Sequence, residues 1–146
     1  MSTNGNQYRR SLYTYWKRTA PPPGMITFDA STRDYCTVER QKTSTPLQSL
    51  VLLNDPQVQE AAEHLATSLL SKELKSHKEN IIHIYRKITG RSPQKKTLRY
   101  LIDYIKEVEK IHLQEEESLD KFDMYHKVYT SLSLLIYNLD ETSQKS

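Results

Sequence analysis

Five histidines are the side chains in this sequence best suited to bind a metal ion or to transfer a proton near neutral pH. A zinc site on a helix needs two histidines four residues apart, usually as HExxH, so that both rings face one ion. No pair has that spacing, and His77 and His83, six residues apart, would lie on different faces of one helix. We therefore expect solvent-exposed or half-buried histidines and no metal site. The five are His64, His77, His83, His112 and His126.

Cys36 is the single cysteine, so the sequence excludes an internal disulfide, a multi-cysteine zinc site and a CxxCH haem-attachment site within itself. Arg33 and Arg40 could lower the pKa of a thiol beside them and make it more nucleophilic. A catalytic triad, however, needs its nucleophile on a special turn. We expect a buried or incidental thiol, no catalytic residue and no cofactor in this chain, which favours a protein that is not an enzyme.

Charged side chains crowd the segment that contains this cysteine. They could form a polar site for a substrate, a polysaccharide or another ligand. In irregular segments, such residues more often pair with one another and with backbone groups. A ligand-binding or enzymatic site in this loop is therefore our alternative hypothesis. Its candidate residues are Asp29, Arg33, Asp34 and Arg40.

Cationic and aromatic side chains alternate in a basic aromatic arm, residues 6–18. Stacking rings beside positive charges are typical of single-stranded nucleic-acid binding, our second alternative. The net charge of only +3 argues against nucleic acid, and tyrosine, tryptophan and arginine are equally typical of protein interfaces. We therefore predict a surface that contacts a protein partner. Its candidate residues are Arg9, Arg10, Tyr13, Trp16, Lys17 and Arg18.

Two consecutive helices are the clearest elements, and they occupy residues 45–70. Thr45 can cap the first, with Pro46 at its first helical position and Gln48 placed to complete a capping box. Asn54, Asp55 and Pro56 end this helix and begin the next. Apolar residues at helical spacing predict a small core. They are Leu47, Leu50, Val51, Leu53, Val58, Ala61, Ala62, Leu65 and Leu69.

Three further helices follow. The first spans residues 79–89 and ends at Gly90; the second begins at Ser92-Pro93 and ends before an acidic break at 114–118. The third spans about residues 119–139, where apolar side chains recur in steps of three and four. That inward stripe consists of Phe122, Tyr125, Tyr129, Leu132, Ile136 and Leu139.

The whole pattern predicts an all-α fold, a small bundle of about five helices, with no membrane span. A proline-rich strap, residues 19–44, precedes the bundle, and a short strand or hairpin near residues 25–28 is left open. We expect a single helical domain over residues 8–140, made of the arm and strap at 8–44 and the helices at 45–140. Residues 1–7 should be a disordered leader and residues 141–146 a flexible tail.

Three motifs follow one another in the first half of the chain: RRSLYTYWKR, PPPGMITFDA and TSTPLQSLVLLNDP. The run that contains them, Tyr8 to Ala62, closely resembles the signature region of the planctomycete secreted domain, number 1553 among domains of unknown function. The segment LLIYNLDE, Leu134 to Glu141, is similar to the family's closing motif. Ser44 departs from the pattern, since asparagine is common there.

This resemblance implies the C-terminal module of larger exported bacterial proteins. Such proteins usually carry another domain of unknown function upstream, and often a cytochrome c-like domain with a CxxCH motif. The family supplies no catalytic residues, and haem binding does not carry over to this chain. The resemblance implies a periplasmic or cell-envelope location, although the sequence begins without a signal-peptide pattern. The expected partners are upstream domains of the same polypeptide or a separate protein.

Overall fold

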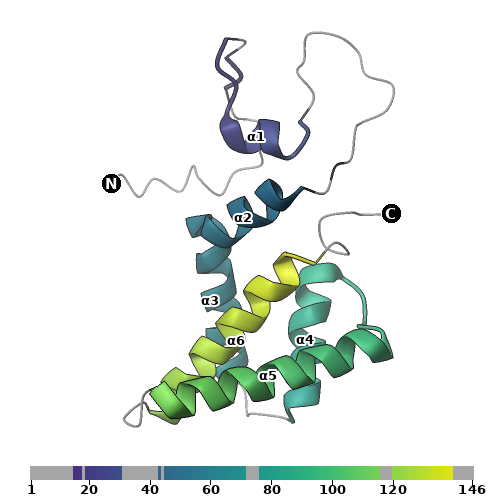
Figure 1. The fold of residues 1–146 in the computed structure, drawn as a ribbon, viewed down its shortest axis with the longest axis vertical. Helices are drawn as coiled ribbons and strands as arrows, with labels where there is room; N and C mark the ends of the chain where they lie inside the picture. Colours follow the sequence, from purple (N-terminus) through teal and green to yellow (C-terminus); the bar gives the residue numbers. More distant parts are fainter. Residues whose placement is uncertain are drawn as a thin grey trace. The chain divides into compact units, whose positions relative to one another are not determined.

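The structure, a computed structural model, describes residues 15–17, 19–30, 43, 45–71, 76–115 and 120–139. In this part of the chain there are six helices and no strand, which confirms the predicted all-α class (Figure 1). The expected leader and the expected tail lie outside the described residues. The chain divides into two compact units, residues 1–43 and residues 44–146. The single domain expected over residues 8–140 stays a prediction.

Among its described residues, the first unit contains one short helix, α1, Pro23–Thr27. Pro23 favours this start because proline has a helical φ and lacks the N–H that would otherwise need a partner there. The N–H of Met25 donates to the carbonyl of Pro22 at 3.0 Å and closes the turn. The strand or hairpin left open near residues 25–28 is therefore wrong, because the prolines lead directly into a helical turn.

The second unit begins with the two helices expected most clearly, α2, Pro46–Asn54, and α3, Pro56–Leu70. The predicted capping box is confirmed. The hydroxyl of Thr45 accepts a hydrogen bond from the N–H of Gln48 at 3.3 Å, and the Gln48 side chain accepts from the N–H of Thr45 at 3.2 Å. The carboxylate of Asp55 caps α3 by accepting from its second N–H at 2.8 Å.

Helix α4, His77–Thr89, begins slightly before its expected start and ends at Gly90 as predicted. Gly90 has φ 74°, a left-handed conformation that residues with a Cβ rarely adopt. Its N–H donates to the carbonyl of Arg86 at 3.0 Å, so it satisfies one of the last carbonyls of the helix.

Helix α5, Lys95–Glu115, begins later than Ser92 and Pro93 predict. Ser92 does not cap the helix; its hydroxyl instead accepts a hydrogen bond from Arg86 Nε at 2.9 Å. This bond ties the end of α4 to the link that leads into α5. The expected start at Ser92 and Pro93 is therefore wrong, because both residues precede the first helical turn, whose bond runs from the N–H of Leu98 to the carbonyl of Gln94.

Helix α6, Lys121–Tyr137, is the central helix of the second unit, because it packs against α3, α4 and α5 and also touches α2. Figure 1 shows it in yellow-green beside α3, with α5 crossing α4. The predicted inward stripe is confirmed at Tyr129, Leu132 and Ile136, which are fully buried. Phe122 is wrongly placed in that stripe, since half of its side chain is exposed at the start of the helix.

The hydrophobic core of the second unit lies between α3, α4, α5 and α6. Two alanines of α3, Ala62 and Ala66, are fully buried, and their small side chains allow a neighbouring helix to approach closely. None of the described helices is long and apolar enough to cross a membrane. The buried core side chains are Ala62, Ala66, Leu69, Ile81, Ile84, Tyr85, Leu101, Ile105, Val128, Tyr129, Leu132 and Ile136.

Helix α2 departs most from expectation. Leu47, Leu50 and Leu53 are 57%, 56% and 44% exposed, so their predicted place in the core is wrong. The buried side chain of this helix is Gln48, which also belongs to the capping box. A helix with apolar residues around most of its circumference cannot bury every face against one set of neighbours. Part of its apolar surface therefore faces outward.

Candidate functional site

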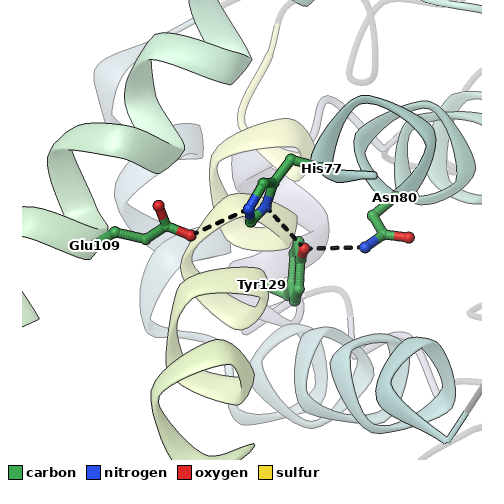
Figure 2. Close-up of polar contacts among 4 residues, drawn as sticks. All are labelled: His77, Asn80, Glu109 and Tyr129. Atoms are coloured by element: carbon green, nitrogen blue, oxygen red, sulfur yellow. Dashed lines mark hydrogen bonds and ion pairs between the residues drawn. The ribbon is translucent and has the colours of Figure 1, made fainter. Parts of the chain in front are cut away.

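A polar network links three helices of the second unit, and Figure 2 shows its four side chains. Tyr129 lies at the centre, on α6. Its hydroxyl oxygen is 3.0 Å from Asn80 Nδ2 and 3.2 Å from His77 Nδ1, both on α4. On the other side of the imidazole, His77 Nε2 is 3.7 Å from Oε1 of Glu109 on α5.

Helical spacing on α4 and α6 brings the side chains of the network together. His77 and Asn80 are three residues apart in the first turn of α4, so they lie on the same face of the helix. Tyr125 and Tyr129 are four apart on α6, with ring centroids 6.2 Å from each other. The Tyr125 ring is also 6.0 Å from the imidazole of His77. The network is thus embedded in aromatic packing where α4 and α6 meet.

The chemistry of the side chains fixes the direction of one hydrogen bond in this network. Asn80 Nδ2 can only donate, so the Tyr129 oxygen accepts that bond. Between the Tyr129 hydroxyl and His77 Nδ1, the tautomer of the imidazole decides which atom donates. At 3.7 Å, His77 Nε2 and Glu109 Oε1 are too far apart for a hydrogen bond, so their contact is purely electrostatic. Among the described residues, Glu109 Oε1 has no hydrogen-bond partner.

Burial raises the pKa of Tyr129 above its ordinary value of 10.0. The negative charge of Glu109 and the neighbouring Tyr125 raise this pKa further, while the hydrogen bond from Asn80 acts in the opposite direction. Tyr129 therefore stays protonated at neutral pH. Burial also raises the pKa of Tyr104 and of Tyr137.

This network has hydrogen-bonding capacity but little access to a substrate. The Tyr129 side chain is fully buried, whereas the side chains of His77 and Glu109 are 47% and 21% exposed. A catalytic acid, base or nucleophile must lie within reach of the reacting atoms. The geometry therefore supports a structural brace that joins α4, α5 and α6. Within the described residues, no group of three or more His, Cys, Asp or Glu side chains is arranged to hold a metal ion.

The residues of the predicted interaction surface are only partly described. Trp16 is half-buried and Lys17 is exposed in the first unit. The carbonyl of Lys17 accepts a hydrogen bond from the N–H of Ala20 at 3.2 Å. The remaining four lie outside the described residues, and the surface stays a prediction. These four are Arg9, Arg10, Tyr13 and Arg18.

In the predicted polar loop site, only Asp29 is described. Its Oδ2 accepts hydrogen bonds from the N–H of Thr43 at 2.9 Å and from the Thr43 hydroxyl at 2.6 Å. Asp29 has φ 52°, a left-handed conformation that aspartate tolerates better than most residues. The carboxylate thus joins two positions 14 residues apart. Arg33, Asp34 and Arg40 lie outside the described residues, so the site as a whole stays a prediction.

The sequence interpretation missed the network around Tyr129. Metal-ligand and nucleophile motifs are short sequence patterns, whereas this network joins side chains from three helices that lie far apart along the chain. One signal was visible: Tyr125 and Tyr129 share a helix face, and a buried tyrosine hydroxyl needs a hydrogen-bond partner. His77 can serve as such a partner, but its position opposite Tyr129 depends on how α4 packs on α6.

A second candidate site is the exposed face of α2. Its three outward leucines, Leu47, Leu50 and Leu53, recur at every third position and so lie within about one third of the helix circumference. Residues 46–54 contain no charged side chain. Interface cores are likewise depleted of charge. This leucine face has the chemistry of a protein-binding surface.

Residues 1–105 match the family described as PSD1, a protein of unknown function (DUF1553). The match spans more than half of the 146 residues. The chain belongs to the DUF1553 family. The DUF1553 match includes α2 and both caps described above and ends within α5, while Leu134 to Glu141 lie beyond it. No curated protein and no solved structure is significantly similar to the chain.

Proposed function

We propose that this chain is a non-catalytic interaction module that docks, through the leucine face of α2, onto an upstream domain of the same polypeptide. The exposure of three leucines on an uncharged helix is the observation that carries the proposal. The polar network around Tyr129 supports the non-catalytic part of the proposal, because its central side chain is buried and holds helices together.

The size of the leucine face favours a partner that is covalently linked. Three half-exposed leucines offer far less apolar surface than a whole interface between separate proteins. A stable complex between separate proteins buries about 800 Å² on each partner. A linked domain, in contrast, is present at a millimolar effective concentration, so a small contact surface suffices. A neighbouring domain therefore fits this surface better than a freely diffusing protein.

The context of the proposal comes from the resemblance to the planctomycete secreted domain. It implies an exported protein in which this chain is the C-terminal module and a cytochrome c-like domain often lies upstream. On the proposed function, the chain positions such upstream domains and contributes no ligand to a haem.

Hydrogen exchange on the chain extended by its upstream region tests this function. Amides of residues 46–54 should exchange more slowly in the extended polypeptide than in the chain alone, because docking covers α2. Leu50→Asp should restore the faster exchange. Ile111→Asp, which also alters a half-exposed apolar residue but lies on α5, should leave the protection unchanged. Identical exchange of α2 with and without the upstream region would refute the proposal.

A further inference from the structure

The end of α4 and the start of α5 form a strongly basic corner. Between residues 80 and 102 the chain has six lysines and arginines and no aspartate or glutamate. All six side chains are exposed. We call this set the basic corner: Arg86, Lys87, Arg91, Lys95, Lys96 and Arg99.

The backbone of the basic corner is well fixed. Gly90 ends α4 in a left-handed conformation, and the Thr89 hydroxyl accepts from the N–H of Arg91 at 3.2 Å and lies 2.8 Å from the carbonyl of Tyr85, to which it donates. Arg86 Nε donates to the Ser92 hydroxyl at 2.9 Å, which uses one of the five N–H groups of the guanidinium. Hydrogen bonds therefore fix the link between α4 and α5, on and beside which the six cationic residues lie.

The basic corner differs from the rest of the described helical surface. On the later turns of α5, cations and anions are mixed, as in Lys106, Glu107, Glu109 and Lys110. Such a mixture is typical of a solvated surface whose charges offset one another. No carboxylate separates these six residues along the sequence, so positive charge is concentrated in this stretch. The N-terminal end of α5 adds the positive end of a helix dipole to it.

An exposed aromatic ring borders the basic corner. Tyr100 is 63% exposed, and Lys96 Nζ lies 6.0 Å from the centre of its ring. Tyrosine has an apolar body and a polar tip, so it is favoured where an apolar phase meets water. Lysine and arginine side chains behave in a related way, since their apolar stems can lie along a surface while their charges meet anions.

We propose that the basic corner binds the surface of an anionic phospholipid membrane. Clusters of four to eight lysines and arginines bind such surfaces by attraction to phosphate-bearing headgroups. The corner lies at the edge of the second unit's helices, where α4 leads into α5 (Figure 1). A basic surface at the edge of the helices can meet a flat membrane, whereas single-stranded nucleic acid is usually bound in a groove with several stacking rings. The contact is peripheral and needs no membrane-spanning helix.

Vesicle co-sedimentation of the full chain tests the proposal. The protein should bind vesicles of phosphatidylcholine with about 30% phosphatidylserine at low salt, and not vesicles of phosphatidylcholine alone. The variant K87Q/R91Q/K95Q/K96Q should lower the partition coefficient by at least about 100-fold. The control K78Q/K106Q/K110Q/K121Q removes the same number of exposed charges from other parts of the second unit. It should retain most of the binding.

Three outcomes would overturn this proposal. The first is no binding to the anionic vesicles at low salt. The second is an equal loss in both variants, because binding would then follow net charge and not the basic corner. The third is tighter binding to a single-stranded oligonucleotide that the corner variant abolishes, since the partner would then be nucleic acid. Circular dichroism of both variants confirms that each is folded before the comparison.

Discussion

Tyr129 belongs both to the hydrophobic core and to the hydrogen-bond network between helices. Its ring is fully buried among the apolar side chains of four helices, while its hydroxyl meets Asn80 and His77. A buried hydroxyl stabilises a fold only when its partners are in place, because water is no longer available to it. The identity of this residue is therefore more constrained than that of an ordinary core aromatic.

Tyr129→Phe should destabilise the protein by about 1–3 kcal/mol, although the aromatic ring is retained. The change removes the acceptor for Asn80 Nδ2 and leaves that buried donor without this partner. Urea unfolding at neutral pH measures the effect. Tyr100→Phe is the control, because this exposed hydroxyl has water available and its loss should change the unfolding free energy little. Equal stabilities for the two variants would contradict the role given to the hydroxyl.

Alkaline conditions should weaken the fold through the buried tyrosines. Burial raises the folded-state pKa of Tyr104, Tyr129 and Tyr137 above 10.0, so above that pH the native state binds more protons than the unfolded state. The unfolding free energy must then fall as pH rises. The contribution is complete below about pH 10 and is lost as the pH passes the folded-state pKa values. Urea midpoints measured across this range test it, and Tyr129→Phe should show a shallower fall than the parent protein.

At the scale of single helices, the residues at the helix ends determine where a helix lies along the chain more than its hydrophobicity does. Helix α2 is apolar over much of its surface, yet its position is fixed by the Thr45 cap and by a buried glutamine, while three leucines face outward. Helix α4 has charged residues on its outer face and ends at a glycine. The start of α2 and the end of α4 are fixed by local hydrogen bonds at residue types that can be recognised in the sequence.

Gly90→Ala should cost about 1 kcal/mol of stability, because a Cβ is unfavourable at φ 74°. No neighbouring atom lies within 4 Å of the added Cβ, so the cost should come from the backbone conformation and not from a clash. Gly24→Ala is the matched control, since Gly24 lies in α1, where alanine is the better helix former. Thermal unfolding of both variants measures the difference. A Gly90→Ala protein as stable as the parent would contradict the left-handed assignment.

At the scale of the whole molecule, the sequence predicts the helices better than their packing. The capping box at Thr45, the proline starts of α2 and α3 and the glycine end of α4 are local signals, and the structure confirms them. The burial of Leu47, Leu50 and Leu53 is wrong, because burial depends on which neighbour covers a face. The network around Tyr129 was missed for the same reason: its partners come from helices that are distant in the sequence.

The order of the helices also has a consequence for synthesis of the protein. Helix α6 supplies four of the core side chains and contacts α3, α4 and α5, but it is the last described helix to leave the ribosome. A fragment that stops at residue 105, where the family match ends, lacks it and should not fold cooperatively. Far-ultraviolet circular dichroism of that fragment, compared with the full chain, measures this, and a sharp thermal transition in the fragment would contradict it. Until its final helix emerges, the nascent chain must hold the apolar faces of three helices without their common partner, so its assembly depends on completion of the C-terminal segment.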